Sequence, residues 1–287
     1  MDVAILGAGR VGTAFGVRLR GAGHRIVAVS GRATTQERTR SYLGRVPVLP
    51  PAEAAARAEV SLIATPDDAI APTCAEIVEA GGVTTGDVVA HVSGGTGLDA
   101  LSPAEAIGAT VASIHPLQTF PDVDSAIELL DGCPIAVTAR TRAGESVAER
   151  LALDVGGRPF ALADGAKPLY HAAAVFASNY LVTVTALARD AAEAAGLEDP
   201  IALFEPLQST TLRNVVAMGP ERALTGPAVR GDAGTIAAHV AALSAAVPHA
   251  VGPYVALATA ALDLAERAGR LEPGLREAVE EGLPPWR

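Results

Sequence analysis

A glycine-rich turn between two short hydrophobic strands opens the chain and restricts its fold more than any other feature. The apolar run at 3–6 predicts a buried strand, residues 13–21 predict a helix, and the run at 26–29 predicts a second strand. The turn that joins the first strand to the helix reads Gly7-Ala8-Gly9-Arg10-Val11-Gly12, with the spacing G-x-G-x-x-G. Together these segments predict a complete βαβ unit.

The spacing of the three glycines is typical of a turn that binds a dinucleotide. Gly7 permits the tight turn, Gly9 lets backbone N–H groups approach a pyrophosphate, and Gly12 lets the helix pack closely on the strand. The start of the helix offers unpaired N–H groups and the positive end of its dipole to the phosphates. We therefore predict that residues 7–12 bind a dinucleotide; the alternative is a glycine-rich turn without a ligand.

The end of the second strand indicates which dinucleotide binds. NAD sites commonly place a carboxylate here, about twenty residues after the glycines, to bind the ribose hydroxyls. This chain instead has Ser30, Gly31 and Arg32, and its next carboxylate is Glu37. A hydroxyl and a guanidinium bind a 2′-phosphate through charge-assisted hydrogen bonds, which favours NADP(H) over NAD(H). The alternative is that Arg32 is an ordinary solvated arginine.

Composition excludes several classes of protein. The chain has 287 residues, 49% of them hydrophobic and 3% aromatic, so an aliphatic core must hold one or two domains. A formal net charge of −10 argues against nucleic acid or an anionic membrane as the main partner, and no apolar run of 18 residues is uninterrupted. Cys74 and Cys133 have no metal-binding spacing, so we expect free thiols and no metal. A strand that begins at residue 3 leaves no room for a signal peptide, so we expect a cytoplasmic protein.

Further strands alternate with helices up to about residue 163. Strands are predicted at 46–48, 59–66, 88–92, 112–114, 134–138 and 158–162. This order predicts a doubly wound parallel sheet, whose ligands bind beyond the carboxyl ends of the strands. Thr65 and Pro66, Ser93 and His115 all fall at such ends, so we assign them to the cofactor site. Gln118, three residues beyond His115, is a candidate substrate contact.

Helical patterns dominate from residue 164 onward. One long helix is predicted from Asp164 to about Ala195, followed by helices near 200–218, 234–247 and 250–269. The sequence therefore predicts a nucleotide-binding domain at 1–163 and a helical substrate and dimerisation domain at 164–287. The second domain is rich in alanine, leucine and valine, so we expect it to form an apolar homodimer interface.

A polar stripe on the long helix supplies the candidate catalytic residues. Lys167, His171 and Ser178 lie within roughly 40° of one another at 100° per residue, and Asn179 lies about 80° from His171. Lys167 is the only lysine among the 22 lysine and arginine residues, which suggests a position where arginine fails because it cannot release a proton. The alternatives are chance survival of one lysine and a structural role for His171 and Asn179 in joining helices.

A glycine-rich loop near residue 230 is a candidate carboxylate site. Thr225, Arg230 and Thr235 lie close to the start of a predicted helix, whose free N–H groups can bind a substrate carboxylate. The alternative is an ordinary loop in which Asp232 caps the helix and pairs with Arg230.

Taken together, these segments resemble a known bacterial family that pairs a Rossmann-like domain with a C-terminal domain of unknown function. The resemblance covers essentially the whole chain. Besides the opening, it is carried by Ala-Thr-Pro-Asp-Asp-Ala-Ile at 64–70, His-Pro-Leu-Gln-Thr-Phe at 115–120, Tyr-His-Ala-Ala-Ala-Val-Phe-Ala-Ser-Asn-Tyr at 170–180 and Leu-Thr-Gly-Pro-Ala-Val-Arg-Gly-Asp at 224–232. One branch of this family resembles the PanG-type alternative ketopantoate reductases. More distant similarity extends to β-hydroxyacid dehydrogenases, ordinary ketopantoate reductases and pyrroline-5-carboxylate reductases.

The resemblance implies roles for individual residues. It implies an all-α C-terminal domain like that of 6-phosphogluconate dehydrogenase. Lys167 matches the lysine that hydroxyacid dehydrogenases and ordinary ketopantoate reductases use at the start of their first long interdomain helix. His171 stands where an asparagine is expected and Asn179 follows two turns later, so the proton donor stays open between Lys167 and His171. His115-Pro116 is similar to a pair in prephenate dehydrogenases, and the loop at 225–235 is similar to the carboxylate-binding loop of pyrroline-5-carboxylate reductases.

These inferences define one main hypothesis and two alternatives. The main hypothesis is an NADPH-dependent reductase of a small 2-oxo acid, above all ketopantoate, with a small carboxylate as substrate. The first alternative is an imine reductase of the pyrroline-5-carboxylate type. The second is a dinucleotide-binding sensor without catalytic activity.

Overall fold

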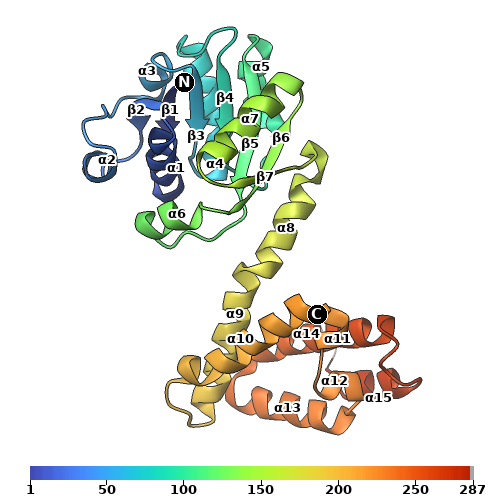
Figure 1. Ribbon diagram of the computed structural model, residues 1–287. Helices are drawn as coiled ribbons and strands as arrows, with labels where there is room; N and C mark the ends of the chain where they lie inside the picture. Colours follow the sequence, from blue (N-terminus) through green and yellow to red (C-terminus); the bar gives the residue numbers. More distant parts are fainter. Residues whose placement is uncertain (285–287) are drawn as a thin grey trace. The chain divides into compact units, whose positions relative to one another are not determined.

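The computed structural model describes residues 1–284 and divides into two compact units, Met1–Ser178 and the residues from Asn179 onward (Figure 1). The sequence places this division at 163/164, whereas the structure places it after Ser178. The difference arises because the helix that follows residue 164 begins within the first unit, where the side chain of Lys167 is fully buried.

A single seven-stranded sheet forms the centre of the first unit. Its strands are β1 (Asp2–Leu6), β2 (Arg25–Ser30), β3 (Val60–Ile63), β4 (Val88–His91), β5 (Thr110–Pro116), β6 (Pro134–Ala139) and β7 (Arg158–Ala161). They are arranged in the order β2-β1-β3-β4-β5-β6-β7. All neighbouring pairs are parallel except β5 and β6, which are antiparallel. The predicted α/β fold is confirmed, and the strand predicted at 46–48 is reduced to one bridge between Val29 and Val48.

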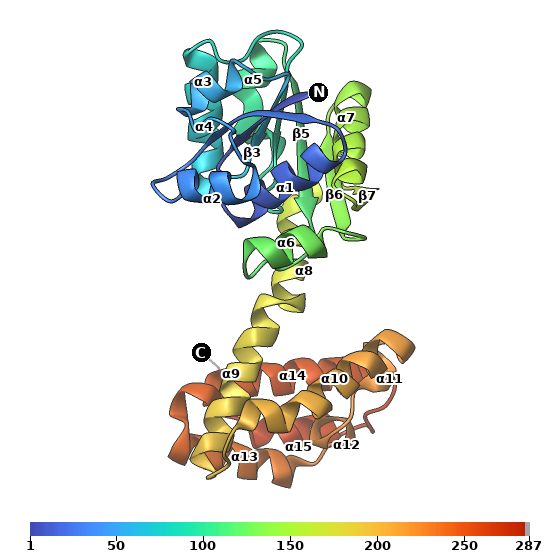
Figure 2. The ribbon, with the colours of Figure 1, turned by 60° about the vertical axis from the view of Figure 1, so that its left-hand side comes forward.

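Helices cover both faces of this sheet. The first unit contains α1 (Arg10–Gly21), α2 (Thr35–Tyr42), α3 (Pro51–Ala55), α4 (Asp67–Glu79), η1 (Leu98–Leu101), α5 (Ser102–Ala106), α6 (Val123–Leu129), α7 (Arg142–Asp154), η2 (Asp164–Ala166) and α8 (Lys167–Ala177). Figure 2 shows α7 on one side of the sheet and α3, α4 and α5 on the other.

The two cores follow from the alternation of side chains along the strands. In β1, Val3 and Ile5 join a cluster with residues of α1, α6 and α7, whereas Ala4 and Leu6 join one with residues of α3, α4 and α5. Successive side chains of a strand point to opposite faces, so a strand covered on both faces is apolar throughout. The run Val-Ala-Ile-Leu has this pattern, and all four side chains are buried.

The second unit is helical. It contains α9 (Asn179–Ala194), α10 (Pro200–Met218), α11 (Pro220–Ala223), α12 (Pro227–Arg230), α13 (Ala233–Ala246), η3 (Pro248–Ala250), α14 (Val251–Arg267) and α15 (Leu275–Glu281). Its core is small and centres on Ile236, Leu262 and Val279. The helices predicted near 200–218, 234–247 and 250–269 are confirmed. The helix predicted over 164–195 is present but interrupted at one residue: the backbone of Ser178 leaves the helical region between α8 and α9, although its N–H still donates to the carbonyl of Ala174.

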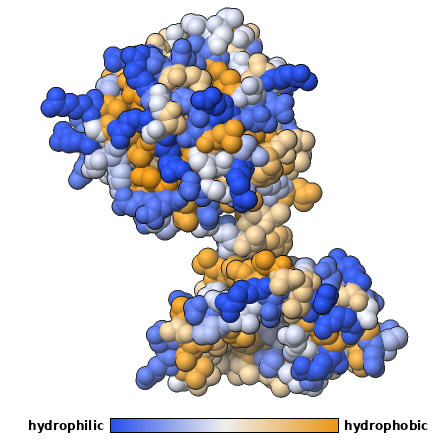
Figure 3. Space-filling model, viewed as in Figure 1, coloured by the Kyte–Doolittle hydropathy of each residue, from blue (hydrophilic) through white to orange (hydrophobic). Residues whose placement is uncertain are grey.

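Exposed apolar side chains are frequent on α8, α9 and α10. Leu169, Val182, Leu207 and Val216 are each at least 65% exposed, and Figure 3 shows hydrophobic surface on the face of the helical unit in view. Within residues 1–284, one stretch, Asp164–Ala194, is long and apolar enough to cross a membrane by length and composition alone. A single such stretch is weak evidence for a span.

Candidate active site

The sheet gathers the predicted cofactor residues at one edge. The glycine-rich turn follows β1, Ser30 ends β2, Thr65 follows β3, Ser93 follows β4, and His115 lies near the end of β5. Because β1 to β5 are all parallel, their carboxyl ends meet at the same edge of the sheet. Residues far apart in the sequence therefore lie along one rim.

The glycine-rich turn is packed too tightly for side chains at two of its three glycines. Gly7 has a φ of +104°, and a Cβ there would lie 2.7 Å from the carbonyl of Ala64. A Cβ at Gly12 would lie 2.4 Å from the Gly7 oxygen. At Gly9, by contrast, a Cβ would lie 4.0 Å from its nearest neighbour, the Gly7 oxygen, so the backbone is open on that side. The first turn of α1 contains no acidic residue, so its free N–H groups can face an anion.

Arg10 joins the glycine-rich turn to the loop after β5. Its guanidinium donates hydrogen bonds to the carbonyls of Phe120 (3.1 Å) and Pro121 (3.0 Å). The side chain of Arg10 therefore has protein partners, and any contact with a dinucleotide is made by its backbone N–H or its remaining donors. In the same loop, Gln118 is exposed, and its side-chain oxygen accepts from the N–H of Thr119.

The segment after β2 contains an arginine that was not predicted from the sequence as a site residue. Ser30 is buried and its carbonyl accepts hydrogen bonds from the N–H groups of Gly7 and Ala8, both at 2.9 Å. Arg32 is exposed in the following loop. Arg38 on α2 donates to the carbonyl of Ala8 at 2.8 Å, which places a second cation beside the glycine-rich turn. The available signal was that Arg38 stands on the helix directly after the loop that contains Arg32.

Thr65 contributes a polar atom that lacks a partner. Its hydroxyl oxygen is buried and has no hydrogen-bond partner among the described residues. Buried hydroxyl groups are normally satisfied, so an unpaired one beside a candidate ligand site calls for an explanation. Pro66, the next residue, precedes the first turn of α4 and is exposed.

All the polar groups of Ser93 are used within the protein. Its N–H donates to the Nδ1 of His91 (3.1 Å), and its hydroxyl donates to Thr96 Oγ1 (3.0 Å) while accepting from the N–H groups of Gly95 and Thr96. Its carbonyl accepts from Lys167 and Ser113. One donor and two acceptor sites exhaust a hydroxyl, so Ser93 fixes the turn at 93–97.

Lys167 is a buried cation with neutral hydrogen-bond partners. Its ammonium is fully buried and donates to the carbonyl of Ser93 (2.9 Å) and the hydroxyl of Ser113 (2.8 Å). Burial lowers its pKa from the ordinary 10.5 to about 8, while Asp164 and Asp67 oppose this shift. With no exposed surface, Lys167 cannot contact a substrate unless neighbouring groups move.

His115 and His171 meet beside the turn at 93–97. His115 Nδ1 forms a 2.9 Å hydrogen bond with the hydroxyl of Tyr170, and its ring meets that of His171 edge to face at a centroid distance of 6.2 Å. Burial, and then the charge of Lys167, lower the pKa of His115 to about 4, so this imidazole is neutral near pH 7. His171 is half-buried, and its Nδ1 is buried without a partner in the described part of the chain.

Ion pairs hold the start of α8 against this edge. Asp164 accepts from the N–H of Leu98 at 2.9 Å and pairs with Arg140 at 3.3 Å. Arg140 also pairs with Asp99 and Glu105. Asp164, at the start of η2, therefore ties α8 to the segment after β4.

The remaining candidates do not join this cluster within the first unit. Ser178 ends that unit, and Asn179 begins α9 in the second unit with its side chain exposed. The loop with Thr225, Arg230 and Thr235 also belongs to the second unit.

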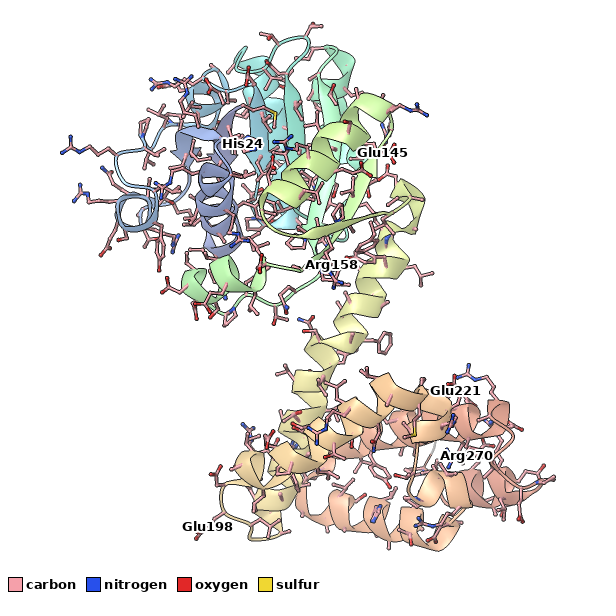
Figure 4. All side chains as sticks on the ribbon, viewed as in Figure 1. His24, Glu145, Arg158, Glu198, Glu221 and Arg270 are labelled. Carbon is pink, nitrogen blue, oxygen red and sulfur yellow. The ribbon has the colours of Figure 1, made fainter. Side chains whose placement is uncertain are left out.

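The loop at 225–235 has the geometry of the alternative in which Asp232 caps the following helix. Asp232 accepts from both the N–H (3.0 Å) and the hydroxyl (2.7 Å) of Thr235, and it lies 4.0 Å from Arg230. Arg270 holds the preceding segment by donating to the carbonyls of Glu221 and Leu224 (Figure 4). Asp232 therefore caps α13, as the alternative proposed, and Thr225 is exposed. Across residues 1–284, no group of three or more histidine, cysteine, aspartate or glutamate side chains is arranged to hold a metal ion.

The buried histidines predict a loss of stability in acid. Burial, with a further effect from Lys167, lowers the pKa of His91 to about 3, and that of His115 is about 4. Below the unfolded value of 6.5 the unfolded chain binds more protons than the folded one, so the free energy of unfolding falls as the pH drops from 6.5 toward 4. For His115 this corresponds to about 3 kcal/mol. Denaturant unfolding at several pH values measures it, and His115→Asn should show a smaller fall; an equal fall would contradict the neutral state of His115.

The fold and this rim define a Rossmann-type nucleotide-binding unit followed by a helical unit. Residues 1–116 match the family described as a Rossmann-like domain, and residues 133–261 match the domain of unknown function DUF2520. The chain therefore combines a Rossmann-like domain with a DUF2520 domain, as the sequence resemblance implied. No curated protein matches the chain.

Solved structures share this fold. A Bacteroides fragilis protein provisionally described as an NADP oxidoreductase is 24% identical, with a TM-score of 0.75 over 91% of this chain and 98% of its own. The protein TM1727 from Thermotoga maritima is 23% identical, with a TM-score of 0.69 over 94% of this chain and 100% of its own. An imine reductase from Myxococcus stipitatus, solved with NADP+, is 15% identical, with a TM-score of 0.67 over 99% of each chain.

Proposed function

We propose that this protein is an NADPH-dependent oxidoreductase that reduces the carbonyl group of a small 2-oxo acid, with ketopantoate, reduced to pantoate, as the specific substrate. The observation that carries the proposal is the single sheet edge at which an open glycine-rich turn, two arginines and a buried cluster of lysine and histidine side chains all lie. The Bacteroides fragilis and Myxococcus stipitatus structures support the choice of cofactor class through a shared fold.

The residues at this edge fit NADP(H). The open side of Gly9 and the first-turn N–H groups of α1 suit the pyrophosphate. The unpaired hydroxyl of Thr65 lies beside the same turn, since a Cβ at Gly7 would lie 2.8 Å from the Thr65 nitrogen. Arg32 and Arg38 supply two cations where the 2′-phosphate would bind, and the first carboxylate after β2 is Glu37 on α2.

Reduction of a ketone requires a hydride at carbon and a proton at oxygen. Bound NADPH supplies the hydride, and the protein must supply the proton and stabilise the charge that develops on oxygen. Of the two candidate donors, His171 is half-buried with an unpaired nitrogen, whereas Lys167 is fully buried and has two partners. We therefore assign the proton to His171 and give Lys167 the task of holding the turn at 93–97. Catalytic participation of Asn179, and substrate binding by Gln118, Ser178, Thr225, Arg230 and Thr235, stay predictions.

A second candidate function is the reduction of an imine. It is favoured by the fold shared with imine reductases from Myxococcus stipitatus and Streptomyces aurantiacus and with a reductive aminase from Aspergillus terreus, which have TM-scores of 0.67, 0.57 and 0.64. An imine accepts a hydride in the same way, but it reacts as the protonated cation. A neutral imidazole beside the reacting group is therefore compatible with an imine substrate as well as with a carbonyl substrate. A sensor without activity is the third possibility.

The test is NADPH oxidation by the purified protein, followed spectrophotometrically with ketopantoate and, separately, with pyrroline-5-carboxylate. The proposal expects turnover with ketopantoate and formation of pantoate. Turnover with pyrroline-5-carboxylate alone supports the imine reductase. If the protein binds NADPH and oxidises it with neither compound, the result favours the sensor.

We also propose that the protein is a homodimer built through residues beyond about 163. The exposed apolar side chains of α9 and α10 support this, because monomers rarely expose so much apolar surface. An apolar groove of about 570 Å³, lined mainly by alanine, leucine and valine of α9, α13 and α14, adds to it. Sedimentation velocity should give one species of twice the chain mass at micromolar concentration. A single monomeric species there would contradict the proposal.

A further inference from the structure

The side chain of Arg10 connects two segments that the proposed function assigns to different ligands. Arg10 is the first residue of α1, at the glycine-rich turn, and its Nη1 donates to the carbonyls of Phe120 (3.1 Å) and Pro121 (3.0 Å). Both carbonyls belong to the loop at 117–121, which follows β5 and contains Gln118, the predicted substrate contact. One exposed guanidinium therefore joins the turn that would bind the dinucleotide to the loop that would bind the substrate.

The hydrogen bonds to the loop use only part of this guanidinium. An arginine side chain has donors on Nε, Nη1 and Nη2, and both bonds to the loop are made by Nη1. Within residues 1–284, the Nε and Nη2 of Arg10 form no hydrogen bond and no ion pair. Two parallel N–H groups on one edge of a guanidinium are the arrangement that binds a phosphate through two hydrogen bonds. Arg10 can therefore hold the loop and a phosphate oxygen at the same time.

The surroundings of Arg10 leave these donors available to an anion. The first turn of α1 has no acidic residue, and the N–H groups at the start of a helix attract phosphates. Asp122 is the carboxylate next to the two carbonyls in the sequence, but it caps α6 by accepting from the N–H (2.7 Å) and the hydroxyl (3.0 Å) of Ser125. Within the described part of the chain, no carboxylate competes with a phosphate for the guanidinium of Arg10 at ion-pair distance.

The loop at 117–121 is fixed at its two ends and exposed between them. At one end, the N–H of Leu117 donates to the first carbonyl of β6 at 2.8 Å. At the other end, Phe120 packs against the core cluster that contains residues of α1 and α6, two helices that lie side by side in Figures 1 and 2. Gln118 and Thr119 are exposed. Among residues 1–284, Arg10 alone donates a side-chain hydrogen bond to this loop from another segment.

We propose that Arg10 is a positioning residue that links the bound dinucleotide to the loop at 117–121. This rests on the proposed function. Its Nη1 holds the loop, and its Nε and Nη2 bind a pyrophosphate oxygen. When that oxygen is bound, the guanidinium loses freedom, the two carbonyls are held more firmly, and Gln118 is placed for the substrate. The dinucleotide and the substrate therefore favour each other's binding through one side chain.

Amide hydrogen exchange at residues 117–120, measured with and without NADP+, tests this link without turnover. In the wild type, bound NADP+ should slow exchange in the loop by about fivefold or more. In Arg10→Met saturated with NADP+, the loop should exchange at the rate of the free protein. Arg20→Met is the matched control, because Arg20 is exposed on the same helix and donates to the carbonyl of Tyr42 at 2.9 Å. This control should show the same protection as the wild type.

Arg10→Lys separates the charge from the link. Lysine keeps the positive charge but lacks the planar fork that reaches two partners at once. Arg10→Met should weaken NADPH binding by about tenfold, whereas Arg10→Lys should stay within about threefold of the wild type. At saturating NADPH, both variants should raise KM for ketopantoate by about fivefold or more, with a smaller change in kcat. An arginine with a purely structural role would show neither this KM effect nor the loss of NADP+-dependent protection.

The outcomes distinguish the link from the proposed function. If the wild type reduces ketopantoate, but NADP+ leaves exchange at 117–120 unchanged or slows it equally in Arg10→Met, the link is wrong and the proposed function stands. If NADP+ protects the loop only when Arg10 is present and ketopantoate is not reduced, the link stands and the substrate assignment fails. If the wild type binds no NADP+, both fail. Arg10 is exposed, so thermal unfolding of Arg10→Met should match that of the wild type.

Discussion

Replacing Arg32 and Arg38 together by alanine should weaken NADPH binding by roughly 10²-fold or more. A charge-assisted hydrogen bond to a phosphate contributes about 1.5–3 kcal/mol, and the double variant removes at least two such contacts. Arg32 lies in the loop after β2, and Arg38 stands beside the glycine-rich turn through its bond to Ala8. Calorimetric titration of each variant with NADPH and with NADH measures the effect.

The same titrations contain their own control. NADH lacks the 2′-phosphate, so its affinity should change by no more than a few-fold, the part that reflects the lost bond between Arg38 and Ala8. Arg40 is an exposed arginine on the same helix, and Arg40→Ala should leave both affinities unchanged. If the double variant weakens NADH as much as NADPH, these arginines do not recognise the 2′-phosphate.

Replacing Lys167 by methionine should lower kcat by about 10²-fold while NADPH affinity stays near that of the wild type. The ammonium holds the carbonyl of Ser93 and the hydroxyl of Ser113, and so fixes the turn against which His115 and His171 pack. Residues that position catalytic groups in this way typically contribute 10- to 100-fold. The free energy of unfolding should change little. Methionine loses the two hydrogen bonds of the ammonium, but it also removes the cost of burying a charge.

Arginine at the same position should behave differently. Lys167 is fully buried, so the larger guanidinium has no room and Lys167→Arg should cost about 1–3 kcal/mol of stability. Thermal unfolding of the two variants, alongside steady-state kinetics, makes the comparison. A chain that tolerates Lys167→Arg without loss of stability or kcat would show that this ammonium has no special role. Loss of all activity in Lys167→Met, with His171→Asn fully active, would make Lys167 the proton donor.

Local sequence patterns were sufficient for most of the sheet in the first unit. The run at 3–6, the three glycines and the alternation of strands with helices predicted the sheet, because strands buried on both faces are apolar throughout. The edge at which Thr65, Ser93 and His115 lie followed from topology alone. The antiparallel pairing of β5 with β6 could not be predicted, because no residue in β6 distinguishes a parallel from an antiparallel strand.

The chemistry of individual side chains depended on contacts that sequence does not contain. Lys167 was predicted as a candidate proton donor because it is the only lysine. Its burial and its two hydrogen-bond partners, Ser93 after β4 and Ser113 in β5, could not be predicted in that way. The meeting of His115 with His171 depends on where α8 begins relative to the sheet. The break at Ser178 also went unpredicted, since no proline or glycine marks it.

The capping of α13 by Asp232 shows the opposite case. The contacts of Asp232 with Thr235, three residues away, are local, so the sequence alone predicts this cap. Arg38 was missed for the reason that applied to Lys167: its contact with Ala8 joins two segments thirty residues apart in the chain. Long-range contacts, more than local patterns, decide which polar residues form the site.

The most direct measurement of the central claim is titration of the wild-type protein with NADPH and with NADH under identical conditions. The site has an open glycine-rich turn, Arg32 in the loop after β2 and Arg38 on α2, and no carboxylate in that loop before Glu37, which favours NADPH. We predict one NADPH site per chain and an affinity at least tenfold higher than that for NADH. Equal affinity for the two cofactors, or no binding of either, would contradict this account.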